Sequence, residues 1–163
     1  MINEIPFNKP GIVGKELEYI QQTIKNWHIS GDGTFTHKCN LFLEKELGVT
    51  KTLLTTSCTH ALEMSAILLD IKPGDEVIVP SFTFVSTINA FVLRGAKPVF
   101  IDIHPDTLNM DENQLEGLIT EKTKAIIPVH YAGVSCEMDI IMNIANKYDI
   151  PVIEDNAHGL FGK

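Results

Sequence analysis

Polar and aromatic side chains follow five short apolar runs of the chain, at the point where each run ends. These positions are Ser57–His60, Ser81–Phe84, Asp102, His130–Gly133 and Glu154–Gly159. If the apolar runs are strands of a parallel sheet, their carboxyl ends share one edge, and ligands of open α/β sheets bind outside that edge. The sequence therefore predicts one binding site that is built from these segments.

The segment Ser57-Cys58-Thr59-His60 stands where an apolar run turns into a helix. The first turn of a helix has unpaired N–H groups and a positive dipole end, so this segment favours binding of a phosphate. Ser and Thr are also preferred helix caps, which is the alternative role. The segment contains neither G-x-G-x-x-G nor G-x-x-x-x-G-K-[ST], so it is neither a dinucleotide fingerprint nor a P-loop.

Asp155 carries the most specific chemistry, because it follows the apolar run Pro151–Ile153. A carboxylate in a desolvated crevice is costly unless a cation or a strong donor meets it. A protonated pyridine nitrogen is such a partner, and an acidic residue that keeps this nitrogen charged makes a pyridoxal ring an electron sink. The alternative is a carboxylate that caps the next helix turn or pairs with a basic residue at the surface.

Phe84 and His158 are two further candidates at the same edge. An aromatic ring at Phe84 can stack on a flat heteroaromatic ligand, or it can be an ordinary core phenylalanine. His158 can donate to the edge of such a ligand, or it can be a surface histidine.

A metal site is the competing interpretation, since mixtures of histidine and carboxylate suit zinc or iron. Its candidate ligands are His130, Glu154, Asp155 and His158. Their spacing matches no H-E-x-x-H motif and no close histidine pair, so we predict no metal. His28, His37 and His104 are expected in loops or at the surface.

The chain has 163 residues, of which 44% are hydrophobic and 21% charged, and its net charge is −8. This composition is typical of an ordered globular domain. The acidic balance argues against nucleic acid or an anionic membrane as a partner, and no apolar run reaches the roughly 18 residues of a membrane helix. Three separated cysteines without a C-x-x-C pair and the lack of a secretory pattern favour the cytoplasm.

Apolar runs alternate with amphipathic stretches from residue 52 onward. The predicted strands are Thr52–Thr56, Glu76–Val79, Pro98–Ile101, Ala125–Val129 and Pro151–Ile153. The predicted helices between them are Thr59–Leu69, Val85–Leu93, Glu112–Ile119 and Met138–Tyr148. This alternation predicts an α/β fold with three layers, in which helices flank a mainly parallel sheet. Two more helical segments, Gly14–Asn26 and Asn40–Leu47, precede it and are separated by a loop at residues 29–36.

Three stretches of this sequence match motifs of a known family. They are residues 57–111 (beginning SCTHALEM), residues 123–139 (TKAIIPVHYAGVSCEMD) and residues 151–159 (PVIEDNAHG). The chain resembles the DegT-type sugar aminotransferases, which are fold-type I pyridoxal-phosphate enzymes. The resemblance implies transfer of an amino group from an amino-acid donor, glutamate, to the 4-keto carbon of a 4-keto-6-deoxy dTDP-hexose in surface polysaccharide biosynthesis.

The resemblance also implies a role for each candidate residue. Cys58, Thr59 and His60 hold the phosphate of pyridoxal 5′-phosphate, and Phe84 stacks on its pyridine ring. Asp155 holds the ring nitrogen. His158 lies near the phenolic oxygen of the ring.

The family's Schiff-base lysine belongs to a later segment than any that this sequence contains, and Lys163 is not assigned a catalytic role. The resemblance therefore implies an N-terminal helical arm and substrate-side loop at residues 1–50, followed by the N-terminal half of the large cofactor domain at residues 51–163. The other half and the small domain are expected to be absent, and the chain alone is expected to be inactive. The whole enzyme is expected to be a homodimer. The alternative is an inactive fragment that serves as a binding or assembly partner of a full-length subunit.

Overall fold

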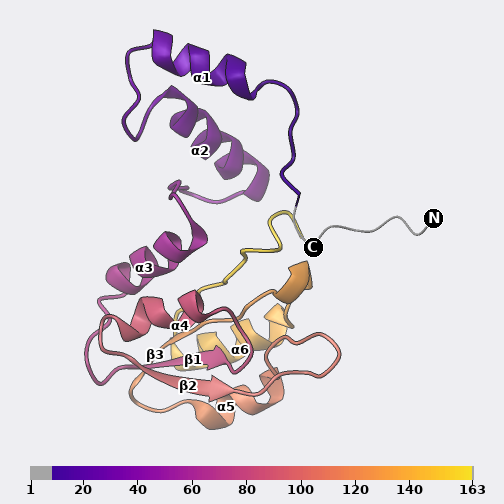
Figure 1. Ribbon diagram of the computed structural model, residues 1–163. Coiled ribbons are helices and arrows are strands. Elements are labelled where there is room, and N and C mark those ends of the chain that lie inside the picture. Colours follow the sequence, from indigo (N-terminus) through magenta and orange to yellow (C-terminus); the bar gives the residue numbers. More distant parts are fainter. Residues whose placement is uncertain (1–8, 163) are drawn as a thin grey trace, which may run out of the picture. The chain divides into compact units, whose positions relative to one another are not determined.

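The computed structural model describes residues 9–162, which divide into two compact units between Leu54 and Thr55 (Figure 1). The sequence placed this boundary after residue 50. Lys163 lies outside the described residues.

The first unit contains two helices, α1 (Glu16–Lys25) and α2 (Thr34–Leu47). Their aromatic rings meet where Tyr19 contacts Phe35, with the ring centroids 5.1 Å apart. Helix α2 begins inside the segment that was predicted to be a loop. It ends at Leu47 and is capped by Gly48, whose φ of 65° is the left-handed conformation that glycine favours at this position.

The second unit holds a parallel sheet, and its helices alternate with the strands along the chain (Figure 1). The strands are β1 (Glu76–Pro80), β2 (Lys97–Ile101) and β3 (Thr123–Ile126), in the order β2-β1-β3. The helices are α3 (Cys58–Leu68), α4 (Val85–Val92), α5 (Leu115–Leu118) and α6 (Met138–Tyr148), with short 3-10 turns at Glu112–Gln114 and Tyr131–Gly133. This arrangement confirms the predicted α/β class. No helix among the described residues is long and apolar enough to cross a bilayer.

Neighbouring side chains of β1 enter two separate hydrophobic cores, because successive residues of a strand point to opposite faces of the sheet. Val77 belongs to one core and Ile78 to the other, and both are fully buried. The first core also contains Leu62, Ala66 and Phe91, from α3 and α4. The second also contains Leu115, Ile141 and Ala145, from α5 and α6. Burial of each large apolar side chain contributes about 1.5–3 kcal/mol, so helices on both faces hold the sheet in place.

Three predicted strands are wrong or incomplete in the structure. The strand predicted at Ala125–Val129 is β3, which begins at Thr123 and ends at Ile126. Residues 52–56 form no strand, and within the described residues no neighbouring strand supplies the hydrogen bonds that an extended segment needs. Residues 151–153 contribute only an isolated parallel bridge from Val152 to Ile126. A second such bridge joins Val129 to Asp155, and it brings Asp155 to the end of the sheet where β3 leaves off.

Candidate cofactor site

A cavity of about 230 Å³ lies where the chain leaves β1 and β3. Five of the predicted site residues line it: Cys58, Thr59, Phe84, Asp155 and His158. Its volume is below the roughly 300–1,000 Å³ that is common for drug-sized ligands, so it suits a small ligand. The sixth predicted residue, His60, does not line it.

The start of α3 supplies free backbone donors to this cavity. Ser57 caps the helix, because its hydroxyl oxygen accepts a 3.1 Å hydrogen bond from the backbone N–H of His60. Within residues 9–162 the backbone N–H groups of Cys58 and Thr59 have no hydrogen-bond partner. The His60 ring instead bonds the hydroxyl of Thr56. The cap therefore uses the His60 N–H group and leaves the Cys58 and Thr59 N–H groups available to a ligand.

Asp155 is buried, with 6% of its surface exposed, and both of its carboxylate oxygens accept hydrogen bonds. Oδ2 accepts from the Thr87 hydroxyl at 2.6 Å. Oδ1 accepts from the Cys58 thiol at 3.5 Å and from the backbone N–H of Ala157 at 3.3 Å, so a turn-capping contact is also present. The ion pairs among the described residues include none to Asp155. A buried carboxylate that has only neutral donors favours a cationic ligand.

The thiol of Cys58 is held in its protonated form beside Asp155. The residue as a whole is exposed, but its sulfur lies against the carboxylate at the cavity wall. Partial burial and then the negative charge of Asp155 raise the pKa of Cys58 to about 11. The thiol is therefore a hydrogen-bond donor at neutral pH and a poor nucleophile.

Aromatic side chains form the remaining wall of the cavity. Phe84 directly precedes α4 and is 72% exposed, so it is not the core phenylalanine of the alternative interpretation. The Tyr131 ring contacts Phe82 at 5.1 Å and His158 at 6.0 Å between centroids. His158 accepts from the backbone N–H of Ala132 through Nδ1 at 3.3 Å, which assigns the proton of the neutral ring to Nε2. Nε2 is thus a donor with no partner among the described residues.

His130 lines the cavity and holds the turn that follows it. Its Nδ1 accepts from the backbone N–H of Cys136 at 3.1 Å, so Nε2 carries the proton and donates to Glu154 at 2.8 Å. Both ring nitrogens are therefore engaged. In the part of the chain that the structure describes, these two residues do not join Asp155 and His158 in a group of converging metal ligands.

Sequence reasoning missed Thr87, and it gave no individual role to Thr83 and Tyr131, which lie in the predicted strand-end segments Ser81–Phe84 and His130–Gly133. The hydroxyl of Thr83 lies 2.9 Å from that of Thr87, and Thr87 donates to Asp155, so the two hydroxyls form a relay to the carboxylate. Thr83 precedes α4 and its cap Phe84, so this contact joins the turn before the helix to the first part of the helix. Nothing in the sequence linked Thr87 to Asp155, which lies 68 positions later.

Comparison with known proteins gives a consistent result. The model of the DegT/DnrJ/EryC1/StrS aminotransferase family matches residues 10–162. An uncharacterized protein of Methanocaldococcus jannaschii is 44% identical, over 98% of this chain and 42% of its own length. The UDP-4-amino-4-deoxy-L-arabinose–oxoglutarate aminotransferase of Shewanella sediminis is 40% identical, over 98% of this chain and 41% of its own length.

A solved structure supports the same grouping. A putative sugar aminotransferase of Streptococcus pneumoniae, in its PLP form, has a TM-score of 0.85 and 35% identity, and the match covers 96% of this chain and 44% of that one. The chain thus spans about two fifths of the length of the curated relatives that it matches. Because the family model covers nearly all of the described residues, the chain belongs to the DegT/DnrJ/EryC1/StrS aminotransferase family.

Proposed function

We propose that the cavity binds pyridoxal 5′-phosphate and that the chain forms part of a nucleotide-sugar aminotransferase. The observation that carries the proposal is Asp155, a buried carboxylate in the cavity wall that has only neutral donors. A protonated pyridine nitrogen would supply the missing positive charge. The family match and the PLP form of the similar structure from S. pneumoniae support this choice of ligand.

The residues present fit this cofactor in type and placement. The free N–H groups of Cys58 and Thr59 would bind the phosphate at the positive end of α3. Phe84 would lie against one face of the ring, and Nε2–H of His158 would donate to an oxygen at its edge. His60 was also predicted to bind the phosphate. Its backbone N–H already donates to the Ser57 hydroxyl, so the proposed phosphate site does not include it.

Each residue then has a defined task. When bound, pyridoxal phosphate supplies an electron sink that permits transfer of an amino group. Asp155 would keep the ring nitrogen protonated, because loss of that proton would leave the buried carboxylate without a counter-charge. Thr87 holds the carboxylate in position through its 2.6 Å hydrogen bond. Cys58 contributes a second, weaker donor.

The substrate is part of the proposal. We infer a 4-keto-6-deoxy dTDP-hexose as acceptor and glutamate as donor, in a homodimeric enzyme of surface polysaccharide synthesis that forms dTDP-4-amino-4,6-dideoxygalactose. The support is the resemblance at residues 57–111 and 123–139, together with the sugar-nucleotide aminotransferase of S. sediminis. The lysine that forms the covalent link to the cofactor is not assigned to any residue of this chain.

Cofactor binding is tested by calorimetric titration of the full chain with pyridoxal phosphate. We expect Asp155→Asn to weaken binding at least tenfold, because it removes the charge that faces the ring nitrogen. Glu154→Gln is the matched control, since it removes the neighbouring carboxylate, which pairs with His130 and does not line the cavity. Equal loss in both variants, or no binding by the unmodified chain, would contradict the proposal.

Substrate choice needs a longer protein that contains this chain. Such a protein is incubated with glutamate and either a dTDP-linked or a UDP-linked 4-keto-6-deoxyhexose, and release of 2-oxoglutarate is measured. We expect faster release with the dTDP-linked sugar. Faster release with the UDP-linked sugar would contradict the proposed dTDP-linked substrate, but it would still support transfer of an amino group to a nucleotide sugar.

A further inference from the structure

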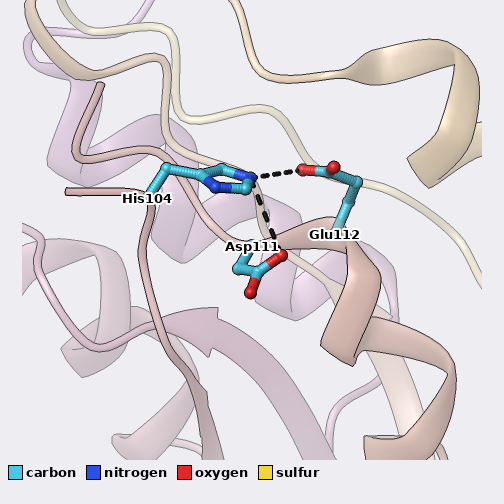
Figure 2. A group of neighbouring side chains, drawn as sticks. All are labelled: His104, Asp111 and Glu112. Carbon is cyan, nitrogen blue, oxygen red and sulfur yellow. Dashed lines mark hydrogen bonds and ion pairs between the residues drawn. The ribbon is translucent and has the colours of Figure 1, made fainter. Parts of the chain in front are cut away.

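A second group of charged side chains lies in the loop after β2 (Figure 2). The cavity beside this group has no lining residue in common with the candidate cofactor cavity. An antiparallel bridge between Ile103 and Met110 closes this loop. His104 follows one side of the bridge, while Asp111 and Glu112 follow the other. The fold therefore brings an imidazole and two carboxylates together from positions that are seven and eight residues apart.

The ligand atoms converge from three sides of a small space. His104 Nε2 lies 2.8 Å from Glu112 Oε2 and 3.7 Å from Asp111 Oδ1. All three atoms lie within 4.8 Å of one another. Zinc bonds to nitrogen and oxygen are about 2.0–2.2 Å, which puts ligand atoms of one ion roughly 3–3.5 Å apart. Side-chain shifts of up to about an ångström would therefore let one ion contact all three.

Glu112 is the residue whose surroundings most favour a cation. Its side chain is only 7% exposed. Among residues 9–162 its only ion-pair partner is the imidazole of His104, which carries no charge in its neutral form. A buried carboxylate without a full counter-charge is costly, and a divalent ion would supply that charge.

Neighbouring amides hold both carboxylates in orientation. Asn113 Nδ2 donates to Asp111 Oδ1 at 2.9 Å and to Glu112 Oε1 at 3.0 Å. Gln114 Nε2 donates to Asp111 Oδ2 at 2.7 Å. These bonds leave Glu112 Oε2 directed at His104, as Figure 2 shows. Hydrogen-bonded partners that orient the ligands are a regular feature of metal sites.

Space for further ligands lies beside the group. A cavity of about 290 Å³ is lined by His104 and Glu112, and also by the acidic residues Asp106 and Glu137. Water can complete the coordination of an ion there, and the additional carboxylates raise the negative potential that attracts it.

We propose that His104, Asp111 and Glu112 form a binding site for a divalent transition-metal ion, with zinc as the best match. One imidazole nitrogen and two carboxylate oxygens are ligands that zinc accepts, with water in the fourth position. The ion would fasten the end of the β2 loop to the turn Glu112–Gln114, so its role is structural. Without a metal, His104 Nε2 and Glu112 Oε2 share a 2.8 Å hydrogen bond.

The proposal is tested on the full chain, made without a polyhistidine tag and without added cofactor. The protein is dialysed against low-micromolar zinc, and bound zinc is counted by mass spectrometry. We expect the unmodified chain to retain one equivalent more than His104→Gln, and the zinc affinity of that variant to fall at least tenfold. Asp111→Asn is a second variant, with a smaller expected loss.

His37→Gln is the matched control, because His37 forms an exposed pair with a single carboxylate, Asp32, at a similar distance of 3.7 Å. We expect it to retain as much zinc as the unmodified chain. Circular dichroism of each variant shows whether it is folded, and zinc should raise the melting temperature of the unmodified chain and of His37→Gln but not of His104→Gln. Equal zinc retention by unmodified chain and His104→Gln, or none by the unmodified chain, overturns the proposal and leaves an ion pair only.

Discussion

The hydroxyl of Thr87 donates a 2.6 Å hydrogen bond to the carboxylate of Asp155, although the two residues are 68 positions apart. Both side chains are buried, and the Thr83 hydroxyl in turn lies 2.9 Å from the Thr87 hydroxyl. This contact joins α4 to the segment that follows the last apolar run. The carboxylate is therefore fixed by the fold before any ligand binds, which is how a precise binding group is best supported.

Removal of the Thr87 hydroxyl should destabilise the protein. Thr87→Val leaves one oxygen of a buried carboxylate without its donor, and such a loss costs about 1–3 kcal/mol. Thr87→Ser keeps the donor and removes only a methyl group, worth about 0.8 kcal/mol. Urea denaturation measures both free energies of unfolding. A serine variant as unstable as the valine variant would show that packing, and not the hydrogen bond, is what matters at this position.

The reactivity of Cys58 should be low at neutral pH and should rise steeply in base. With a pKa of about 11, roughly one thiol in a thousand is ionised at pH 8, about 100-fold fewer than for an ordinary cysteine. Alkylation by iodoacetamide, followed by peptide mass spectrometry, should therefore modify the exposed Cys39 first. Asp155→Asn should speed the reaction of Cys58, because removal of the negative charge lowers the pKa of the thiol. Rapid alkylation of Cys58 at pH 7 would disprove the assigned environment.

Substitutions at Phe84 and Phe91 should have different effects on ligand binding and on stability. Phe91 is fully buried, and Phe91→Ala should cost about 3–5 kcal/mol of unfolding free energy. Phe84 is exposed at the cavity, so Phe84→Ala should change stability by no more than about 0.5 kcal/mol. The same variant should lower the affinity for pyridoxal phosphate roughly tenfold, since the pyridine ring loses its stacking partner. Denaturation and calorimetry on the same samples give both quantities.

Gly95 should tolerate no side chain, whereas Gly117 should accept one. Gly95 has a φ of +94°, and a Cβ there would lie 2.7 Å from Cγ and 2.9 Å from Cα of Pro73. Gly95→Ala should therefore destabilise the protein by more than about 1 kcal/mol. Gly117 lies in α5, and the position that a Cβ would take there is in open space, so Gly117→Ala should stabilise the protein by about 0.4–1 kcal/mol. Thermal denaturation ranks the two variants, and a reversed order would refute this account of the turn.

Much of the fold was predictable because its local signals agree with its packing. Helix α6 occupies the predicted range Met138–Tyr148, since its apolar stripe meets the sheet at Ile141 and Ala145. The segment at residues 52–56 was predicted wrongly for the opposite reason. Its apolar composition is typical of a strand, but a strand also needs a neighbour, and apolar composition does not show whether one is present.

The site was predictable to the extent that it follows the ends of the strands. Phe84 follows β1, and Asp155 is bridged to Val129 beyond β3, so the rule for parallel sheets brought these two together. Cys58 lines the same cavity although the apolar run before it forms no strand. Thr87 and His104 escaped notice because their partners are set by packing and loop closure. A histidine outside any recognised motif carries no sign of the two carboxylates beside it until the loop is closed.

The segments that line the candidate cofactor cavity are synthesised at different times. Its lining residues fall in the segments 58–59, 83–86, 129–131 and 155–158, so the Cys58-Thr59 turn leaves the ribosome first and the Asp155 segment last. The two are 97 residues apart. At about 5–20 residues per second, roughly 5–20 s of synthesis separate them. A cofactor can therefore assist the folding of this unit only late, once β1, β2 and β3 have already been made.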